Sequence, residues 1–151
     1  MRRRIISEKI PEPMASVYEK ATIMVIESFY SQVAEEIVSR LKSGVILDLG
    51  TGPGYLPIEI VKRAPSIRVD GIDLTAKLIR MAQENAMKAG VADKLHFEVG
   101  DAAELRFEHS SYDMVISTGM LHMLKDPVKV LKECYRVLKT DREVWIYDPA
   151  Q

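Results

Sequence analysis

The stretch from Val45 to Gly54 reads VILDLGTGPG, and it decides the fold. Its first five residues are almost all apolar and lie between glycines, as in a short strand that is buried on both faces. Three glycines then alternate with other residues, which allows a tight turn and lets a ligand approach the backbone. We expect a strand, a glycine-rich loop and a helix whose free N–H groups favour a carboxylate or phosphate. The alternative interpretation is a strand-to-helix turn that binds nothing.

Strands and helices alternate along the rest of the chain. Apolar residues at helical spacing predict a first helix face, which Ser43-Gly44 ends with a left-handed cap; that face consists of Ile23, Ile26, Tyr30, Val33, Ile37 and Leu41. In the last predicted helix, Asp126 is the N-cap, Pro127 follows, and the expected packed face is Val128, Leu131, Tyr135 and Leu138. Further strands are predicted over 67–72, 95–99, 112–116 and 143–147, with helices over 55–64 and from Thr75 to 89.

This alternation predicts an α/β fold with a doubly wound, Rossmann-like parallel sheet that carries helices on both faces. Residues 1–43 are expected to form an N-terminal arm and helical cap, and residues 44–151 a Rossmann-like ligand-binding domain, together one compact domain. In such a sheet the ligand lies beyond the carboxyl ends of the strands.

Composition excludes several function classes. The chain has 151 residues and a net charge of -1, which suits one globular domain and argues against a nucleic-acid or membrane-surface binder. Its single cysteine, Cys134, excludes a disulfide framework and a cysteine-rich zinc site, and it fits a cytoplasmic location. We expect no metal and no membrane span. Arg2-Arg3-Arg4 is either a solvated tail or a phosphate contact.

Three acidic residues follow three successive predicted strands. Asp48 would meet a cation well, and the loop spacing G-x-G-x-G differs from the G-x-G-x-x-G of dinucleotide sites. Asp73 lies 19 residues beyond Gly54 and is either a ribose ligand or a helix-entry acid. Asp101 can accept a hydrogen bond from the amino group of adenine. Together they predict a site for an adenosine that bears a positively charged tail.

The sequence resembles the class I S-adenosylmethionine-dependent methyltransferases, most closely their small-molecule branch. The motifs that carry this resemblance are Val45–Gly54, Val69–Asp73, Gly100–Ala102, Tyr112–Ser117 and Tyr135–Lys139. The resemblance implies the sheet order 3-2-1-4-5, S-adenosylmethionine as cofactor and S-adenosylhomocysteine as product. It assigns cofactor binding to Asp48, Gly50, Thr51, Gly52, Gly54, Asp73, Leu74, Gly100, Asp101, Ala102, Ser117 and Thr118.

The expected activity is methyl transfer to a small-molecule acceptor by in-line displacement, for which the protein supplies mainly proximity and alignment. His122 is the candidate general base, or else a histidine that is structural or only lines the pocket. The residues expected to line the acceptor pocket are Tyr18, Tyr30, Met120 and His122.

The chain departs from the family pattern at its end. It stops just after the fifth strand, whereas the family's sheet adds two more strands there, so Val144–Tyr147 would be a sheet edge. Either the chain is a fragment or another subunit covers the edge, and we predict a homo-oligomer. A non-catalytic or partner-dependent cofactor-binding module is the alternative function. An NAD(P)-dependent oxidoreductase is disfavoured by the glycine spacing and by Asp48.

Overall fold

The computed structural model describes residues 12–120 and 123–147. Five strands form one parallel sheet, in which β1 is central. The strands are β1 (Gly44–Leu49), β2 (Ile67–Asp73), β3 (Leu95–Val99), β4 (Tyr112–Thr118) and β5 (Leu138–Tyr147). Their order, β3-β2-β1-β4-β5, confirms the predicted topology.

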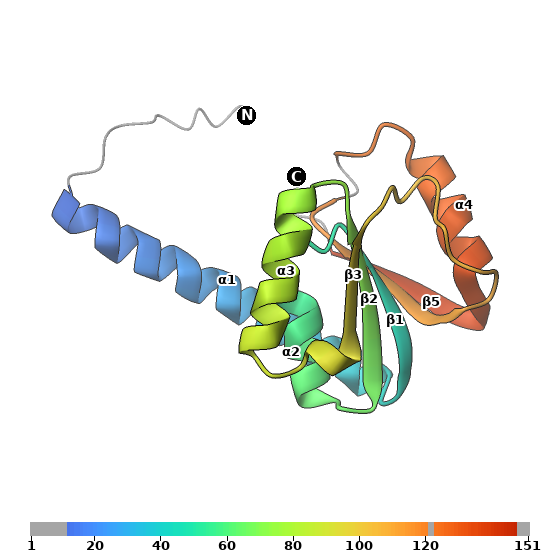
Figure 1. The fold of residues 1–151 in the computed structure, drawn as a ribbon, viewed down its shortest axis with the longest axis horizontal. Coiled ribbons are helices and arrows are strands. Elements are labelled where there is room, and N and C mark those ends of the chain that lie inside the picture. The colour runs from blue at the N-terminus through green and yellow to red at the C-terminus, as the bar shows by residue number, and fades with distance from the viewer. Residues whose placement is uncertain (1–11, 121–122, 148–151) are drawn as a thin grey trace.

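Helices cover both faces of the sheet. They are α1 (Glu12–Arg40), α2 (Tyr55–Arg63), α3 (Ala76–Lys88) and α4 (Pro127–Val137), with a 3-10 turn, η1, at Ala92–Lys94. Figure 1 shows α2 and α3 on one side of the sheet and α4 on the other. Neighbouring residues of β1 pack against the helices on opposite faces of the sheet. Ile46 packs with residues of α1 and α2, while Leu47 packs with residues of α4.

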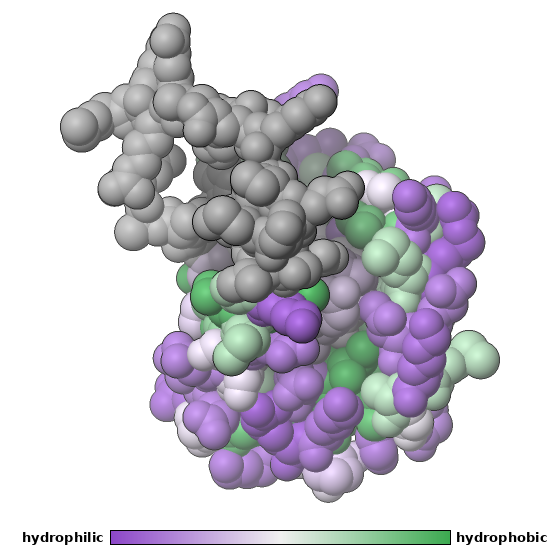
Figure 2. Space-filling model, turned by 90° about the vertical axis from the view of Figure 1, so that its left-hand side faces the viewer, coloured by the Kyte–Doolittle hydropathy of each residue, from purple (hydrophilic) through white to green (hydrophobic). Residues whose placement is uncertain are grey.

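Among the residues of α1 whose burial the structure describes, those of the C-terminal half pack on the domain. Ile37 is fully buried, whereas Ile23 is 47% exposed and Met24 is 69% exposed. In Figure 1 the helix extends away from the body, and the surface in Figure 2 is mostly hydrophilic, with hydrophobic residues beside the grey segment. The helix ends at Arg40, so the prediction that Gly44 caps it was wrong. Gly44 instead begins β1, where a Cβ would lie 2.4 Å from an Asp113 oxygen.

The packed face of α4 differs from the predicted one. Asp126 is the N-cap as expected, and its carboxylate accepts the Lys129 N–H at 3.0 Å. Three of the four residues of the predicted face are exposed, most strongly Tyr135 at 85%, whereas Leu138 is half-buried, packs against the core and begins β5. The residues that pack on the sheet are Val130, Cys134 and Val137.

β5 is one edge of the sheet in the part of the chain that the structure describes. It begins at Leu138, five residues before the predicted start, and its register with β4 shifts between Tyr112 and Met114. Asp113 accounts for the early start, because it accepts the Val45 N–H and bonds Lys139 at 3.1 Å, which holds the incoming segment against the sheet. That a second subunit covers β5 stays a prediction. No helix among the described residues is long and apolar enough to cross a membrane.

Candidate functional site

The loop after β1 follows a left-handed path through its glycines. Gly50, Gly52 and Gly54 have φ values of +71°, +55° and +79°, which residues with a Cβ rarely adopt. A Cβ on Gly50 would lie 2.9 Å from the Met120 sulfur, whereas a Cβ on Gly52 would meet no atom of a described residue within 4 Å. The backbone at Gly52 therefore faces open space into which a ligand can approach.

Asp48 is a buried carboxylate with one oxygen left unpaired. It is 1% exposed, and its Oδ2 accepts the Thr51 hydroxyl at 2.8 Å. Its Oδ1 makes no hydrogen bond to any described residue. Burial raises the pKa of Asp48 to about 7, and the Thr51 hydrogen bond offsets only part of this rise. Because buried polar atoms rarely lack partners, this oxygen points to a ligand donor, ideally a cationic one.

Asp73, at the end of β2, connects the glycine loop to the next helix. Its Oδ2 accepts the Gly52 N–H at 3.0 Å, and its Oδ1 accepts the Thr75 N–H at 2.9 Å. The Thr75 hydroxyl makes no capping bond, so Asp73 serves this helix entry itself. Each carboxylate oxygen can accept a further hydrogen bond, so both predicted roles of Asp73 remain compatible.

Asp101 begins the loop between β3 and β4. Its side chain is exposed, and its Oδ1 accepts the Ala103 N–H at 2.9 Å. Gly100 is bonded through its N–H to the Asp73 carbonyl at 3.1 Å, which aligns the ends of β2 and β3. Leu74 is 72% exposed and lines the same cavity as Gly100 and Asp101.

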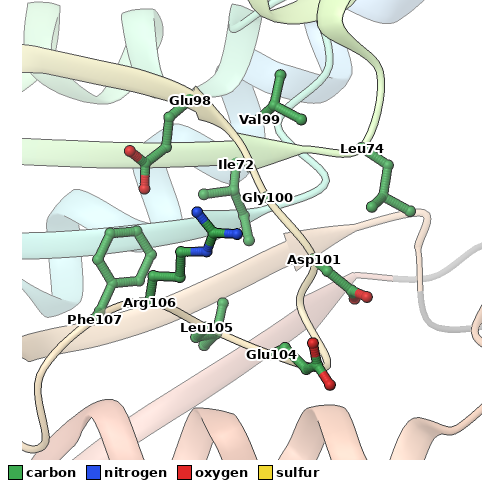
Figure 3. A pocket seen from close by; sticks show the side chains of 10 residues that line it. All are labelled: Ile72, Leu74, Glu98, Val99, Gly100, Asp101, Glu104, Leu105, Arg106 and Phe107. Atoms are coloured by element: carbon green, nitrogen blue, oxygen red, sulfur yellow. The ribbon is translucent and has the colours of Figure 1, made fainter.

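These strand ends surround a cavity of about 300 Å³. Its lining includes Gly50, Asp73, Asp101, Ala102, Thr118 and Met120. A second cavity of about 390 Å³ shares Ile72, Leu74, Gly100 and Asp101 with it. Figure 3 shows this second cavity, where Arg106 and Phe107 come from the β3–β4 loop and lie over the strands. The structure therefore brings predicted residues from four elements to one hollow edge of the sheet.

Ser117 and Thr118 end β4 but face different surroundings. Ser117 is 4% exposed, and its hydroxyl donates to the Leu49 carbonyl at 3.2 Å, so its described contact is structural. Thr118 lines the cavity and lies close enough to the phenol of Tyr30, which comes from α1, to influence the pKa of that group. Burial, and then the nearby charge of Asp48, raise the pKa of Tyr30. The structure thus places Tyr30 near Thr118 and Asp48, and its part in an acceptor pocket stays a prediction.

Two predicted acceptor-side residues lie outside what the structure describes. His122 is outside the described residues, and so is the side chain of Tyr18, although its backbone is in α1. The proposed base therefore stays a prediction. Met120 lines the cavity and packs against Gly50.

Sequence reasoning missed two groups near the site. Tyr55 lies with its ring centre 6.1 Å from that of Tyr30, and its position directly after the last glycine of the loop could have indicated this. Glu133 and Arg136 of α4 hold the β3–β4 loop. Arg136 lies in the Tyr135–Lys139 motif, but the motif does not reveal this role, because the partners of both residues are backbone groups far away in the sequence.

Residues 46–141 match the family described as methyltransferase domain. The chain belongs to this methyltransferase family. The assignment confirms the resemblance to class I S-adenosylmethionine-dependent methyltransferases. The fold agrees with it, since the structure of a Methanococcus maripaludis protein assigned to these enzymes superimposes with a TM-score of 0.79 at 24% identity, covering 97% of this chain and 66% of that one.

Curated relatives carry methyltransferase names. The demethylmenaquinone methyltransferase of Lactobacillus johnsonii is 34% identical over 114 residues, which cover 74% of this chain and 47% of the relative. A ubiquinone/menaquinone biosynthesis C-methyltransferase of Geotalea daltonii is 27% identical over 124 residues, covering 82% and 53% respectively. The chain therefore spans about half the length of the curated relatives it matches.

Proposed function

We propose that this chain binds S-adenosylmethionine at the carboxyl ends of β1, β2 and β3 and transfers its methyl group to a small-molecule acceptor. The observation that carries the proposal is the buried Oδ1 of Asp48, which has no hydrogen-bond partner among the described residues, at the start of the loop whose backbone is open at Gly52. A ligand with an ammonium group would pair with the Asp48 oxygen, and its adenosine part would pass through the space at Gly52. Family membership supports the same cofactor.

The residues at the three strand ends fit this cofactor chemically. Asp48 would pair with the ammonium group of its methionine part, since a charge-assisted hydrogen bond there satisfies the orphan oxygen. Asp73 would accept the ribose hydroxyls with its remaining lone pairs, and Asp101 the adenine amino group. Leu74 would lose its exposure against the adenine ring.

The cofactor, when bound, supplies a sulfonium that already activates the methyl group. The task of the chain is to bind, to align the acceptor in line and to exclude water. Tyr30 and Thr118 stand where the acceptor side would be, and the hydroxyl of Tyr30 would orient an acceptor by hydrogen bonding. His122 would remove a proton if the acceptor must lose one.

Ligand binding by the whole chain tests the proposal. S-adenosylhomocysteine at about one hundred times its Kd should add about 2.7 kcal/mol of stability, raising the midpoint of thermal unfolding by about 5–11 °C for a chain of this size. NAD should not change it. Asp73→Ala should lose most of the shift, and Asp93→Ala, a substitution of an exposed acid in η1, should keep it. No shift for the wild-type chain would refute cofactor binding.

A non-catalytic, cofactor-binding module is the second candidate. Incubation with methyl-labelled S-adenosylmethionine and a panel of hydroxyl, amine and activated-carbon acceptors separates the two. Label transfer to any acceptor supports the enzyme, and binding without transfer across the panel supports the module.

A further inference from the structure

The β3–β4 loop is held from outside, by two side chains of α4. Glu133 Oε2 accepts the Leu105 N–H at 2.7 Å. Arg136 donates to the Leu105 carbonyl at 2.9 Å and to the Phe107 carbonyl at 2.7 Å. Both polar groups of the Leu105 backbone are therefore satisfied by α4, in the way that a neighbouring strand would satisfy them.

Glu133 and Arg136 also fix each other. The guanidinium meets the carboxylate through two parallel bonds, of 2.9 Å and 3.0 Å. Their side chains are only 20% and 23% exposed, so this pair is sheltered from solvent. The hydrogen bond from Arg136 lowers the pKa of Glu133, which keeps the carboxylate charged. A planar five-donor fork makes this arrangement available to arginine but not to lysine.

The loop held by this pair forms one wall of the cofactor cavity. Asp101 and Ala102 line the cavity, and Leu105 lines the adjoining one, where Figure 3 shows it on the loop between the strands and the helix below. The cavity is also lined by Met120 and Leu124, from the segment that leads into α4. The same helix therefore follows one part of the cavity lining in the chain and holds another part through hydrogen bonds.

We propose that Glu133 and Arg136 are positioning residues that set the place of Asp101 and so the affinity for the adenosine part of the cofactor. They do so through the backbone of Leu105 and Phe107 and do not touch the ligand. The inference rests on the proposed cofactor site. It adds that α4, on the far side of the loop from the ligand, determines the width of that site.

A second contact between α4 and the same loop provides the control. Lys129 pairs with Glu104 at 3.3 Å, but these side chains are 51% and 75% exposed. Such pairs contribute little, because water competes for both charges. Removing this contact deletes a positive charge from α4 while leaving the Leu105 and Phe107 backbone bonds intact.

The test measures S-adenosylhomocysteine affinity by calorimetry and hydrogen exchange of residues 101–107 in the free chain. Arg136→Ala should raise the Kd about tenfold, as expected when one to two charge-assisted bonds no longer order the loop. Arg136→Lys should weaken binding less, and Lys129→Ala should leave the Kd within about twofold. Exchange at Leu105 and Phe107 should accelerate in Arg136→Ala only. Millimolar guanidinium chloride should restore affinity to Arg136→Ala but not to Asp73→Ala.

The outcomes distinguish failure of this inference from failure of the proposed cofactor binding on which it rests. Wild-type binding with an unchanged Kd in Arg136→Ala, or an equal loss in Lys129→Ala, overturns the positioning role alone. Absence of wild-type binding overturns the cofactor site and the inference together. If Arg136→Ala does not fold, Arg136→Lys and Glu133→Gln decide in its place, and unchanged affinity in both refutes the role.

Discussion

Replacing Asp48 by asparagine tests whether the carboxylate near the end of β1 is buried at a cost in stability because it binds a ligand. Burial raises its pKa from the ordinary 3.8 to about 7. The folded chain therefore keeps a proton that the unfolded chain releases between these pH values. The free energy of unfolding that the bound proton contributes is fully present below about pH 4 and is lost as the pH rises through about 7.

The size of the effect follows from the gap between the two pKa values. Each pKa unit corresponds to about 1.4 kcal/mol, and the gap is about three units. Relative to Asp48→Asn, the free energy of unfolding of the wild type should thus fall by about 4 kcal/mol between about pH 4 and about pH 7 and then level off. Asparagine keeps an oxygen to accept the Thr51 hydroxyl, so that bond survives.

Urea unfolding of the free chain at a series of pH values measures this difference. Asp93→Asn, in exposed η1, is the matched control and should follow the wild type throughout. Calorimetry measures the effect of the same substitution on ligand binding. Asp48→Asn should bind S-adenosylhomocysteine about tenfold or more weakly than the wild type, because it has lost the charged partner for the ammonium group of the ligand.

Parallel stability curves for the wild type and Asp48→Asn between pH 4 and pH 7 would refute the raised pKa. Wild-type affinity in Asp48→Asn would refute the pairing with the ammonium group, whatever the stability data show.

Three further substitutions or probes test separate parts of the structure. Gly52→Ala should lower the free energy of unfolding, measured in urea, by about 1 kcal/mol, since the φ of Gly52 is +55°. The added Cβ should also lower the affinity for S-adenosylhomocysteine about tenfold or more, because it fills the space that the ligand needs. Unchanged affinity would contradict the inference that a ligand approaches the backbone at Gly52. Asp113→Ala should lower the free energy of unfolding by about 2–3 kcal/mol, because it leaves the Val45 N–H unpaired, and should leave ligand affinity unchanged. Lys139 and the Val45 bond hold the pKa of Asp113 below its ordinary value, so this loss should vanish in acid as the wild-type carboxylate is protonated. Burial raises the pKa of Cys134 to about 11, so a thiol reagent at pH 8 should label the native chain far more slowly than the unfolded one; equal rates would contradict its burial.

The strands were predictable because buried parallel strands carry their signal locally. The run from Val45 to Leu49 is apolar except for Asp48 and lies between two glycines, as is typical of a buried parallel strand. The packed face of α4 was not predictable in this way. Apolar residues occupy two faces of that helix, at Val128 and Leu131 as well as at Val130 and Val137, and the sheet selects the second pair. Periodicity alone cannot choose between two apolar faces.

The candidate site likewise has residues whose positions the local sequence predicts and residues whose positions it does not predict. Asp48, Asp73 and Asp101 were predictable, because parallel strands bring their carboxyl ends to one edge and the residues there can be read from the sequence. The neighbourhood of Tyr30 required the packing of α1, and Arg136 required the path of a loop without regular structure. Both act across distances in the sequence that no local spacing encodes.

Asp48 connects folding to ligand binding in a way that a purely structural carboxylate would not. Its Oδ1 has no partner among the described residues, so the buried charge should make the free chain less stable at neutral pH, and an ammonium partner should offset this loss. Binding should therefore lower the pKa of Asp48 and release a proton below about pH 7, and the bound chain should lose the pH dependence of the free one. Calorimetry at pH 6 in two buffers of different ionisation enthalpy detects that proton. An observed heat independent of the buffer would mean that Asp48 is already charged before the ligand arrives.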